Sequence, residues 1–209
     1  DSEGKISTVA GNGVAGFSGD DGLAAEARLR YPYAVTGNDK GELFILDYGN
    51  YRVRKVGTDN KISTVVGNGD SGEHVEGEEA TKSPMYLPMG FAVNNEGVIF
   101  VSTEHYDEDT DYDISTVLKV GTDGRIRKFA GNGQYAFSGD GGPAVDASFK
   151  YARSIALGKS GEVYIADTVN HRIRMVNSEG IISTIAGTDK AEYAGDDGPA
   201  KAASFKNPS

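Results

Sequence analysis

Apolar residues in this chain come in short runs separated by turns that are rich in Gly, Asn and Asp. Some runs are continuous, such as residues 43–46 (LFIL) and 163–166 (VYIA), which is typical of strands buried on both faces. Others alternate with charged residues, such as residues 51–56 (YRVRKV), which indicates a strand with one dry and one wet face. The pattern therefore predicts an all-β protein of short antiparallel strands joined by tight hairpins.

One six-residue motif occurs four times, as ISTVAG, ISTVVG, IRKFAG and ISTIAG, beginning at Ile6, Ile62, Ile126 and Ile182. Successive copies begin 56, 64 and 56 residues apart (62 − 6, 126 − 62 and 182 − 126). A period of this size indicates an array of one supersecondary unit. Because the last three copies each follow three other strand-like runs, every complete unit is predicted to be a four-stranded antiparallel meander.

The repeat divides the chain into five parts. Residues 1–31 hold the fourth strand (5–10) and connecting loop of a preceding blade, residues 32–87, 88–151 and 152–207 are units 1, 2 and 3, and residues 208–209 begin a following blade. Each unit ends in a 21-residue connecting segment, where Asp followed by Pro-Ala predicts one or two helical turns. A lone sheet of this size cannot bury both faces, and stacking such sheets around an axis gives a β-propeller.

Three groups of residues resemble a known repeat family. Residues 170–173 (NHRI) are similar to the Asn-His-Leu that begins the third strand of the NHL repeat, and residues 50–53 (NYRV) are a looser copy. Residues 136–144 (AFSGDGGPA) look like the connecting loops of NHL proteins found outside the cell. The resemblance implies a β-propeller that acts mostly as a binding scaffold, and it implies a structural role for His171.

The number of units raises the question of how a ring would close. Three complete units are fewer than the four to eight blades of a propeller, and six units of 56 residues would need 336 (6 × 56). We therefore expect further blades from a longer chain or from other copies of this chain. We also expect the first and last units to expose an apolar inner face, lined by Val35, Ile45, Ile155 and Ile165.

Composition narrows the classes of partner. The chain has 21 basic and 31 acidic residues, a formal net charge of −10, whereas nucleic-acid binding requires a basic surface. Hydrophobic residues make up 38% of the chain, and the apolar runs are too short to span a membrane. There is no cysteine, so no disulfide framework exists. We expect neither a nucleic-acid partner nor a membrane span.

Two acidic residues end the second strands of units 1 and 3, each shortly before an arginine of the third strand. Because Asp47 with Arg52 recurs as Asp167 with Arg172, we interpret each pair as an ion pair that holds a hairpin. Unit 2 has lost both members together, which supports a structural role over catalysis. The residues predicted to be structural are Asp47, Arg52, Asp167, Asn170, His171 and Arg172.

The three histidines are unevenly placed. Some NHL-type propellers are lyases whose histidines hold zinc on the ring axis, and a catalytic zinc takes about three converging protein ligands. His74 lies in a connecting segment, His105 in an insertion and His171 at the structural position, so they are not equivalent in the repeat. No nucleophile stands beside a base either. We expect no catalytic residue and no cofactor apart from calcium.

Unit 2 is longer because eight extra residues separate its second and third strands, at about residues 104–113. Asp107, Asp109, Asp111 and Asp113 are spaced by two, as the oxygen ligands of a calcium loop are. The alternative is a solvated acidic loop, because Tyr112 replaces the glycine that an EF-hand requires. Calcium is thus a candidate ligand of these carboxylates.

Positions where unit 2 departs from the repeat are the best candidates for specialised function, because loops on a rigid scaffold usually carry it. We predict an interaction surface at Tyr106 and Tyr112 of the insertion and at Glu73 and His74 of the preceding segment. The favoured function is a non-enzymatic scaffold that binds protein or glycan outside the cell or at its surface. The alternatives are a six-bladed lyase or lactonase with an axial metal, and a structural subunit of a filament.

Overall fold

The computed structural model describes residues 3–109 and 111–209 and contains three sheets, each an antiparallel meander of four strands. Blade 1 consists of β1 (Pro32–Gly37), β2 (Leu43–Asp47), β3 (Arg52–Val56) and β4 (Ile62–Val66). Blade 2 consists of β5 (Leu87–Val93), β6 (Ile99–Asp107), β7 (Tyr112–Val120) and β8 (Ile126–Ala130). Blade 3 consists of β9 (Ala152–Leu157), β10 (Val163–Asp167), β11 (Arg172–Val176) and β12 (Ile182–Ala186). The prediction of an all-β protein with four-stranded blades is confirmed.

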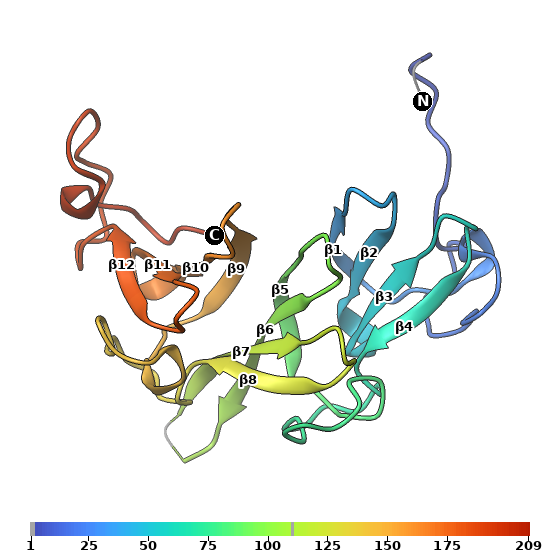
Figure 1. The fold of residues 1–209 in the computed structure, drawn as a ribbon, viewed down its shortest axis with the longest axis horizontal. Coiled ribbons are helices and arrows are strands. Elements are labelled where there is room, and N and C mark those ends of the chain that lie inside the picture. Colours follow the sequence, from blue (N-terminus) through green and yellow to red (C-terminus); the bar gives the residue numbers. More distant parts are fainter. Residues whose placement is uncertain (1–2, 110) are drawn as a thin grey trace.

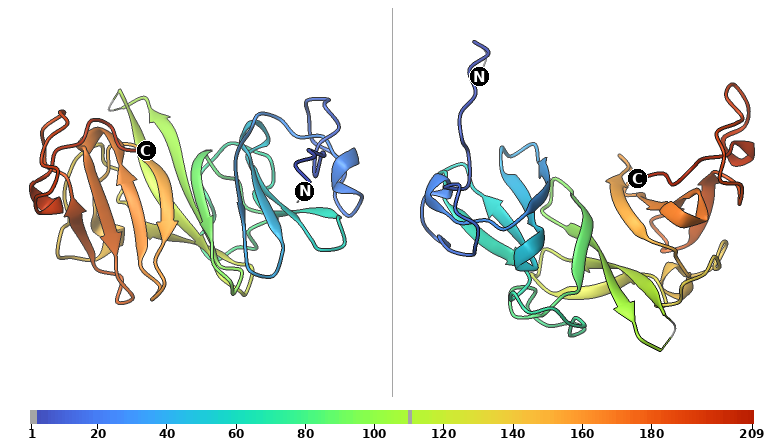
Figure 2. Two further views of the ribbon diagram at one scale, coloured as in Figure 1. Left: turned by 90° about the horizontal axis from the view of Figure 1, so that it is seen from above. Right: turned by 180° about the vertical axis from the view of Figure 1, so that it is seen from behind.

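The three blades stand side by side in an open arc (Figures 1 and 2). The first strands, β1, β5 and β9, line the inside of the arc, and the fourth strands, β4, β8 and β12, lie on its outside (Figure 1). Neighbouring blades meet through their inner strands, β1 against β5 and β5 against β9. This is how blades are arranged around the axis of a propeller.

The hydrophobic core lies between the blades. One cluster joins Phe44 and Leu46 of blade 1 to Val101 of blade 2, and another joins Phe100 of blade 2 to Ile165 of blade 3. Each sheet is therefore buried by its neighbour, as the continuous apolar strands require.

The connecting segment before each blade packs on that blade. Residues 11–31 precede blade 1, 67–87 precede blade 2 and 131–151 precede blade 3. Ala24 and Ala27 of the first segment cover Ile45 and Ile62 of blade 1. The predicted helical turns form in three segments, as the short 3-10 helices η1 (Ala24–Glu26), η3 (Ala144–Asp146) and η5 (Ala200–Ala202). Two more follow second strands, η2 (Tyr48–Asn50) and η4 (Thr168–Asn170).

The expected apolar inner face is only partly exposed. Val35 is 66% exposed, but Ile45, Ile155 and Ile165 are all buried. The prediction was wrong for these three because the connecting segment covers Ile45 and the contact between blades 2 and 3 covers the other two. Residues 5–10, predicted to be a fourth strand, form no strand here, since no other strand lies alongside to pair with them.

The insertion in blade 2 is a hairpin extension rather than a loop. Strands β6 and β7 are nine residues long, whereas their counterparts have five, and they stay paired from Ile99 with Val120 to Asp107 with Tyr112. Residue 110 lies outside the described part of the chain. The longer hairpin projects beyond the other strands (Figure 1). Within the described residues, no helix is long and apolar enough to cross a membrane.

Candidate functional site

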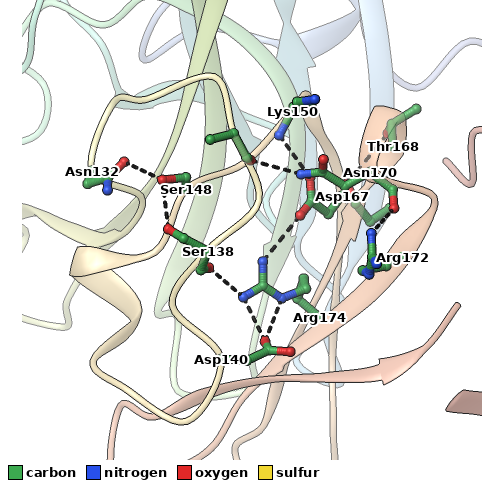
Figure 3. Close-up of polar contacts among 12 residues, drawn as sticks. Asn132, Ser138, Asp140, Ser148, Lys150, Asp167, Thr168, Asn170, Arg172 and Arg174 are labelled. Atoms are coloured by element: carbon green, nitrogen blue, oxygen red, sulfur yellow. Dashed lines mark hydrogen bonds and ion pairs between the residues drawn. The ribbon is translucent and has the colours of Figure 1, made fainter. Parts of the chain in front are cut away.

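Blade 3 buries an arginine beneath the connecting segment that precedes it. The side chain of Arg174 is fully buried, and its Nη1 lies 3.2 Å from Oδ2 of Asp167 (Figure 3). Its Nη2 and Nε lie 2.8 and 3.0 Å from Oδ1 of Asp140, and Nη2 also donates to the carbonyl oxygen of Ser138 at 3.0 Å. This guanidinium therefore links the blade to the segment by charge-assisted hydrogen bonds.

Asp167 is the second anchor of this link. Its carboxylate accepts hydrogen bonds from the backbone N–H of Lys150 at 2.9 Å and from Nδ2 of Asn170 at 2.8 Å. Asn170 also donates to the carbonyl oxygen of Ala136 at 2.9 Å. Burial raises the pKa of the Asp167 carboxyl, while these hydrogen bonds and Arg174 oppose the rise. The carboxylate is thus held by several partners, as a buried charge requires.

Blade 1 repeats the same arrangement. Arg54 is fully buried, with Nη1 3.5 Å from Oδ2 of Asp47 and Nη2 2.6 Å from Oδ1 of Asp20. Asn50 donates to Asp47 and to the carbonyl oxygen of Gly16, both at 2.8 Å. We call this set the arginine site of a blade: Asp20, Asp47, Asn50 and Arg54 in blade 1, and Asp140, Asp167, Asn170 and Arg174 in blade 3.

The predicted ion pairs of Asp47 with Arg52 and of Asp167 with Arg172 were wrong. Each aspartate is cross-strand neighbour to that arginine in the ladder, but its carboxylate contacts the arginine two residues further along the same face. Such diagonal neighbours are within reach of long side chains. The first arginine instead stacks on a phenylalanine of the segment, Arg52 over Phe17 at 3.7 Å and Arg172 over Phe137 at 4.0 Å. It also donates to backbone carbonyl groups.

His171 occupies a turn position. Its φ of 56° is left-handed, and Tyr51 at the equivalent position of blade 1 has a φ of 50°. Its Nδ1 lies 3.3 Å from the backbone nitrogen of Asn207. The structural role predicted for His171 stays a prediction, and this geometry supports it.

Blade 2 has lost the whole arginine site. Thr103 stands at the position of the first aspartate, and its hydroxyl lies 3.1 Å from that of Thr116. Leu118 stands where the buried arginine would be. The full set of replacements is Glu73 for Phe, Glu76 for Asp of the segment, Thr103 for Asp of the strand, Ile114 for Asn, and Thr116 and Leu118 for the two arginines.

A cavity of about 360 Å³ occupies the vacated space. Its wall includes a stacked pair, Tyr86 and His105, with ring centroids 3.9 Å apart. Two predicted surface residues, Glu73 and His74, lie on this cavity. The other lining residues are Thr103, Ile114, Thr116, Leu118, Lys128, Asn132 and Gly133. Tyr86 and Lys128 were not predicted as site residues. Both differ from their counterparts in blades 1 and 3, because Tyr86 replaces a basic residue and Lys128 replaces a threonine.

The other two predicted surface residues lie on the extended hairpin. Tyr106 and Tyr112 are 54% and 53% exposed. Tyr112 stacks on Tyr135 with centroids 4.5 Å apart, and Tyr135 meets Tyr151 edge to face. Tyr151 donates a 2.9 Å hydrogen bond to Asp113, which raises the pKa of its hydroxyl to about 12. Exposed tyrosines of this kind suit a protein or glycan contact.

The four aspartates of the insertion do not converge. Asp113 accepts the hydrogen bond from Tyr151, and Asp111 accepts one from Tyr106. Asp107 accepts from the backbone N–H of Asp109 at 3.1 Å. Because a hairpin divides these residues between two strands and a turn, the carboxylates do not form the shared oxygen cage that calcium needs. Across residues 3–109 and 111–209, no three His, Asp or Glu side chains form a group that could hold a metal ion.

Comparison with known proteins finds similarity to one group of repeat proteins. The model of the teneurin NHL domain matches residues 129–205. Teneurin-m of Drosophila melanogaster is 28% identical over 185 residues, which is 82% of this chain and 6% of that protein. Teneurin-1 of Mus musculus is 29% identical over 220 residues, 91% of this chain and 8% of that protein. These similarities support an NHL-repeat family for this chain.

The chain spans less than a tenth of the length of the curated relatives it matches. Teneurin-4 of Homo sapiens, for example, is 25% identical over 91% of this chain but only 7% of its own length. The similarity supports a β-propeller scaffold for interaction and does not extend to the activity of a whole teneurin.

Solved structures of similar shape have lower sequence identity to this chain. A catalytically inactive virginiamycin B lyase of Staphylococcus aureus with quinupristin has 15% identity and a TM-score of 0.46, covering 79% of this chain and 45% of that one. A putative gluconolactonase has 14% identity and a TM-score of 0.45, covering 74% and 48%. Likeness of this size does not bear on function.

Proposed function

We propose that this chain is a non-enzymatic NHL-type scaffold that binds a protein or glycan outside the cell or at its surface, through blade 2. The observation that carries the proposal is the concentration of departures from the repeat in that blade. Blades 1 and 3 use equivalent residues to hold their own structure, whereas blade 2 replaces them and opens a cavity beside an extended hairpin. Function carried by a rigid array is expected where its repeats differ.

The chemistry of the blade 2 surface suits recognition. Tyr106 and Tyr112 are half exposed on the hairpin, and the stacked rings of Tyr86 and His105 line the cavity behind it. Aromatic side chains of this kind provide contact area at low cost in conformational entropy. The similarity to teneurin NHL domains supports the interaction role, and the resemblance to NHL arrays outside the cell supports the location.

Deleting residues 105–112 tests the proposal. The deletion gives blade 2 the same turn length as blades 1 and 3, so we expect folding to persist while binding is lost. Binding is measured with labelled protein on cells of the source organism and on an immobilised glycan panel. Tyr106→Ser should weaken binding, whereas Tyr193→Ser, which removes a 79% exposed tyrosine outside blade 2, should leave it unchanged.

Two results would overturn this function. Binding that survives the deletion at full strength would place the contact elsewhere. One tightly held zinc per chain in the purified protein would favour the alternative of an enzyme with an axial metal. Further blades from the same longer chain or from other copies also remain a prediction, consistent with the exposed Val35, and native mass measurement by light scattering checks it.

A further inference from the structure

The blade 2 cavity lies where the other two blades bury arginine side chains. Leu118 stands at the position of Arg54 and Arg174, which are both fully buried. Thr116 stands at the position of the other arginine of each pair, Arg52 or Arg172. Since leucine and threonine are shorter than arginine, their side chains leave unfilled the space that appears as the cavity of about 360 Å³.

Groups that accept hydrogen bonds from arginine in the other blades are still present in blade 2. Arg54 donates to the carbonyl oxygen of Ser18 and to Asp20, and Arg52 donates to the carbonyl oxygen of Asn68. The equivalents of the two carbonyl groups belong to His74 and Asn132, which both line the cavity, and the equivalent of Asp20 is Glu76, whose side chain is 62% exposed. None of the three receives an arginine here.

The segment before blade 2 has also gained negative charge. Glu73 replaces the phenylalanine on which an arginine stacks in blades 1 and 3, and it lies on the cavity wall. Its carboxylate makes no hydrogen bond or ion pair with any described residue. The exposed carboxylate of Glu76 uses one oxygen for both of its contacts, with the backbone N–H of Lys128 at 2.9 Å and Nε2 of His74 at 3.2 Å, so the other oxygen is open to a ligand. One cationic side chain, that of Lys128, also lines the cavity.

We propose that this cavity binds the guanidinium group of an arginine side chain that a partner protein presents. A planar guanidinium suits the carbonyl and carboxylate acceptors that the repeat provides at this place, and it can stack on the Tyr86–His105 pair that lines the cavity. The proposal rests on the proposed scaffold function and names the feature that the partner must carry. It favours a protein over a glycan as the partner.

Titration with Nα-acetyl-arginine amide tests the proposal directly, using calorimetry and the NMR signals of His74, His105 and Tyr86. A single side chain is expected to bind with a Kd of about 1–10 mM. The uncharged Nα-acetyl-citrulline amide keeps nearly the same shape, and the lysine amide keeps the charge without the planar fork. Both should bind at least about fivefold more weakly, because bidentate contacts distinguish guanidinium groups.

Variants of the cavity sharpen the test. Glu73→Gln should weaken binding of the arginine amide about fivefold, and Thr116→Arg, which supplies the missing arginine from the chain itself, should abolish it. Lys128→Thr restores the residue of blades 1 and 3 and should tighten binding by removing a like charge. Glu96→Gln and Thr122→Arg change the same residue types in exposed turns of blade 2, away from this cavity, and should have no effect.

The proposal is overturned if the citrulline amide binds as tightly as the arginine amide, if Glu73→Gln has no effect, or if neutral sugars shift the same signals while the arginine amide does not. These outcomes do not depend on the cell and glycan assays. Loss of arginine binding with intact, hairpin-dependent binding to cells would leave the scaffold function standing and would remove only this assignment.

Discussion

Blades 1 and 3 differ from blade 2 in how each is attached to the segment that precedes it. In the first two, a fully buried arginine joins an aspartate of the strand to an aspartate of the segment. In blade 2 the strand carries Thr103 and Leu118 instead, and a pair of threonine hydroxyl groups replaces the ion pair. In blade 2 all residues of the arginine site are replaced together. This indicates that the site works as one unit and that losing only some of its residues would lower the stability of the blade.

The largest expected effect comes from breaking the arginine site of blade 3. Arg174→Leu should lower the free energy of unfolding by about 3–5 kcal/mol, because it leaves the buried carboxylate of Asp167 without its charged partner. Urea unfolding followed by circular dichroism measures the loss, and hydrogen exchange of the β11 amides localises it.

A double variant separates a cooperative unit from independent contacts. Asp167→Thr with Arg174→Leu gives blade 3 the pair that blade 2 carries, and it should cost less than Arg174→Leu alone by about 1 kcal/mol or more. If the double variant loses as much as the two single variants added together, the interpretation of the site as one unit is wrong.

The next largest expected loss of stability comes from substituting a glycine in the connecting segment before blade 3. Gly139 has a φ of 92°, and a Cβ placed on it would lie 2.6 Å from the Cα of Ala147. Gly139→Ala should therefore destabilise blade 3 by about 2–3 kcal/mol, through strain and a backbone contact that cannot move. In the segment before blade 2 the same position holds Val75, which is 52% exposed.

Val75→Ala is the matched control for this glycine. Because the side chain of Val75 is half exposed, its truncation should change the free energy of unfolding by no more than about 0.5 kcal/mol. Thermal unfolding of both variants makes the comparison. If both variants lost the same free energy of unfolding, the backbone at this position would be equally constrained in the two segments despite their different sequences.

The fold was predictable because the repeat shows each strand several times, so that a weak pattern at one copy is supported by the others. The arginine site was only half predicted. Asp47 and Asp167 were predicted to be structural, but each was paired with the nearest arginine in sequence, whereas its partner lies diagonally across the ladder. The repeated Arg-x-Arg of β3 and β11 indicated that a second arginine could be the partner, since both arginines lie on one face of the strand.

Two features of blade 2 were not predicted from the sequence. The insertion is acidic and was interpreted as a loop, yet its aromatic and β-branched residues, such as Tyr106, Tyr112 and Ile114, favour strand pairing. The cavity depends on space left by residues far apart in the chain, including Glu73, Thr103 and Leu118. Unfilled volume follows from packing in three dimensions, which a repeat alignment does not display.

Apart from the control variants, the smallest expected effect comes from a carboxyl group that only blade 2 carries at its position. Glu104 is buried at a position where blades 1 and 3 have Tyr48 and Thr168. Its Oε1 accepts no hydrogen bond, and the nearest charge is Nε of Arg153 at 3.5 Å. Burial raises the pKa of this carboxyl from 4.5 to about 6, although Arg153 opposes the shift. Ionised Glu104 is therefore a cost to the fold that the other blades avoid.

The sign of the pH dependence follows from this pKa. Between about pH 4.5 and 6 the folded protein binds this proton more tightly than the unfolded chain does, so the free energy of unfolding falls as the pH rises, by about 2 kcal/mol in all. Glu104→Gln should remove that slope and raise the free energy of unfolding at pH 7.5 by about 1–2 kcal/mol. Urea unfolding at pH 4.5, 6 and 7.5 measures both effects, with Glu96→Gln as an exposed control. A variant that keeps the slope would show that other groups cause it, and one that is less stable at pH 7.5 would show that Arg153 stabilises ionised Glu104 more than burial destabilises it.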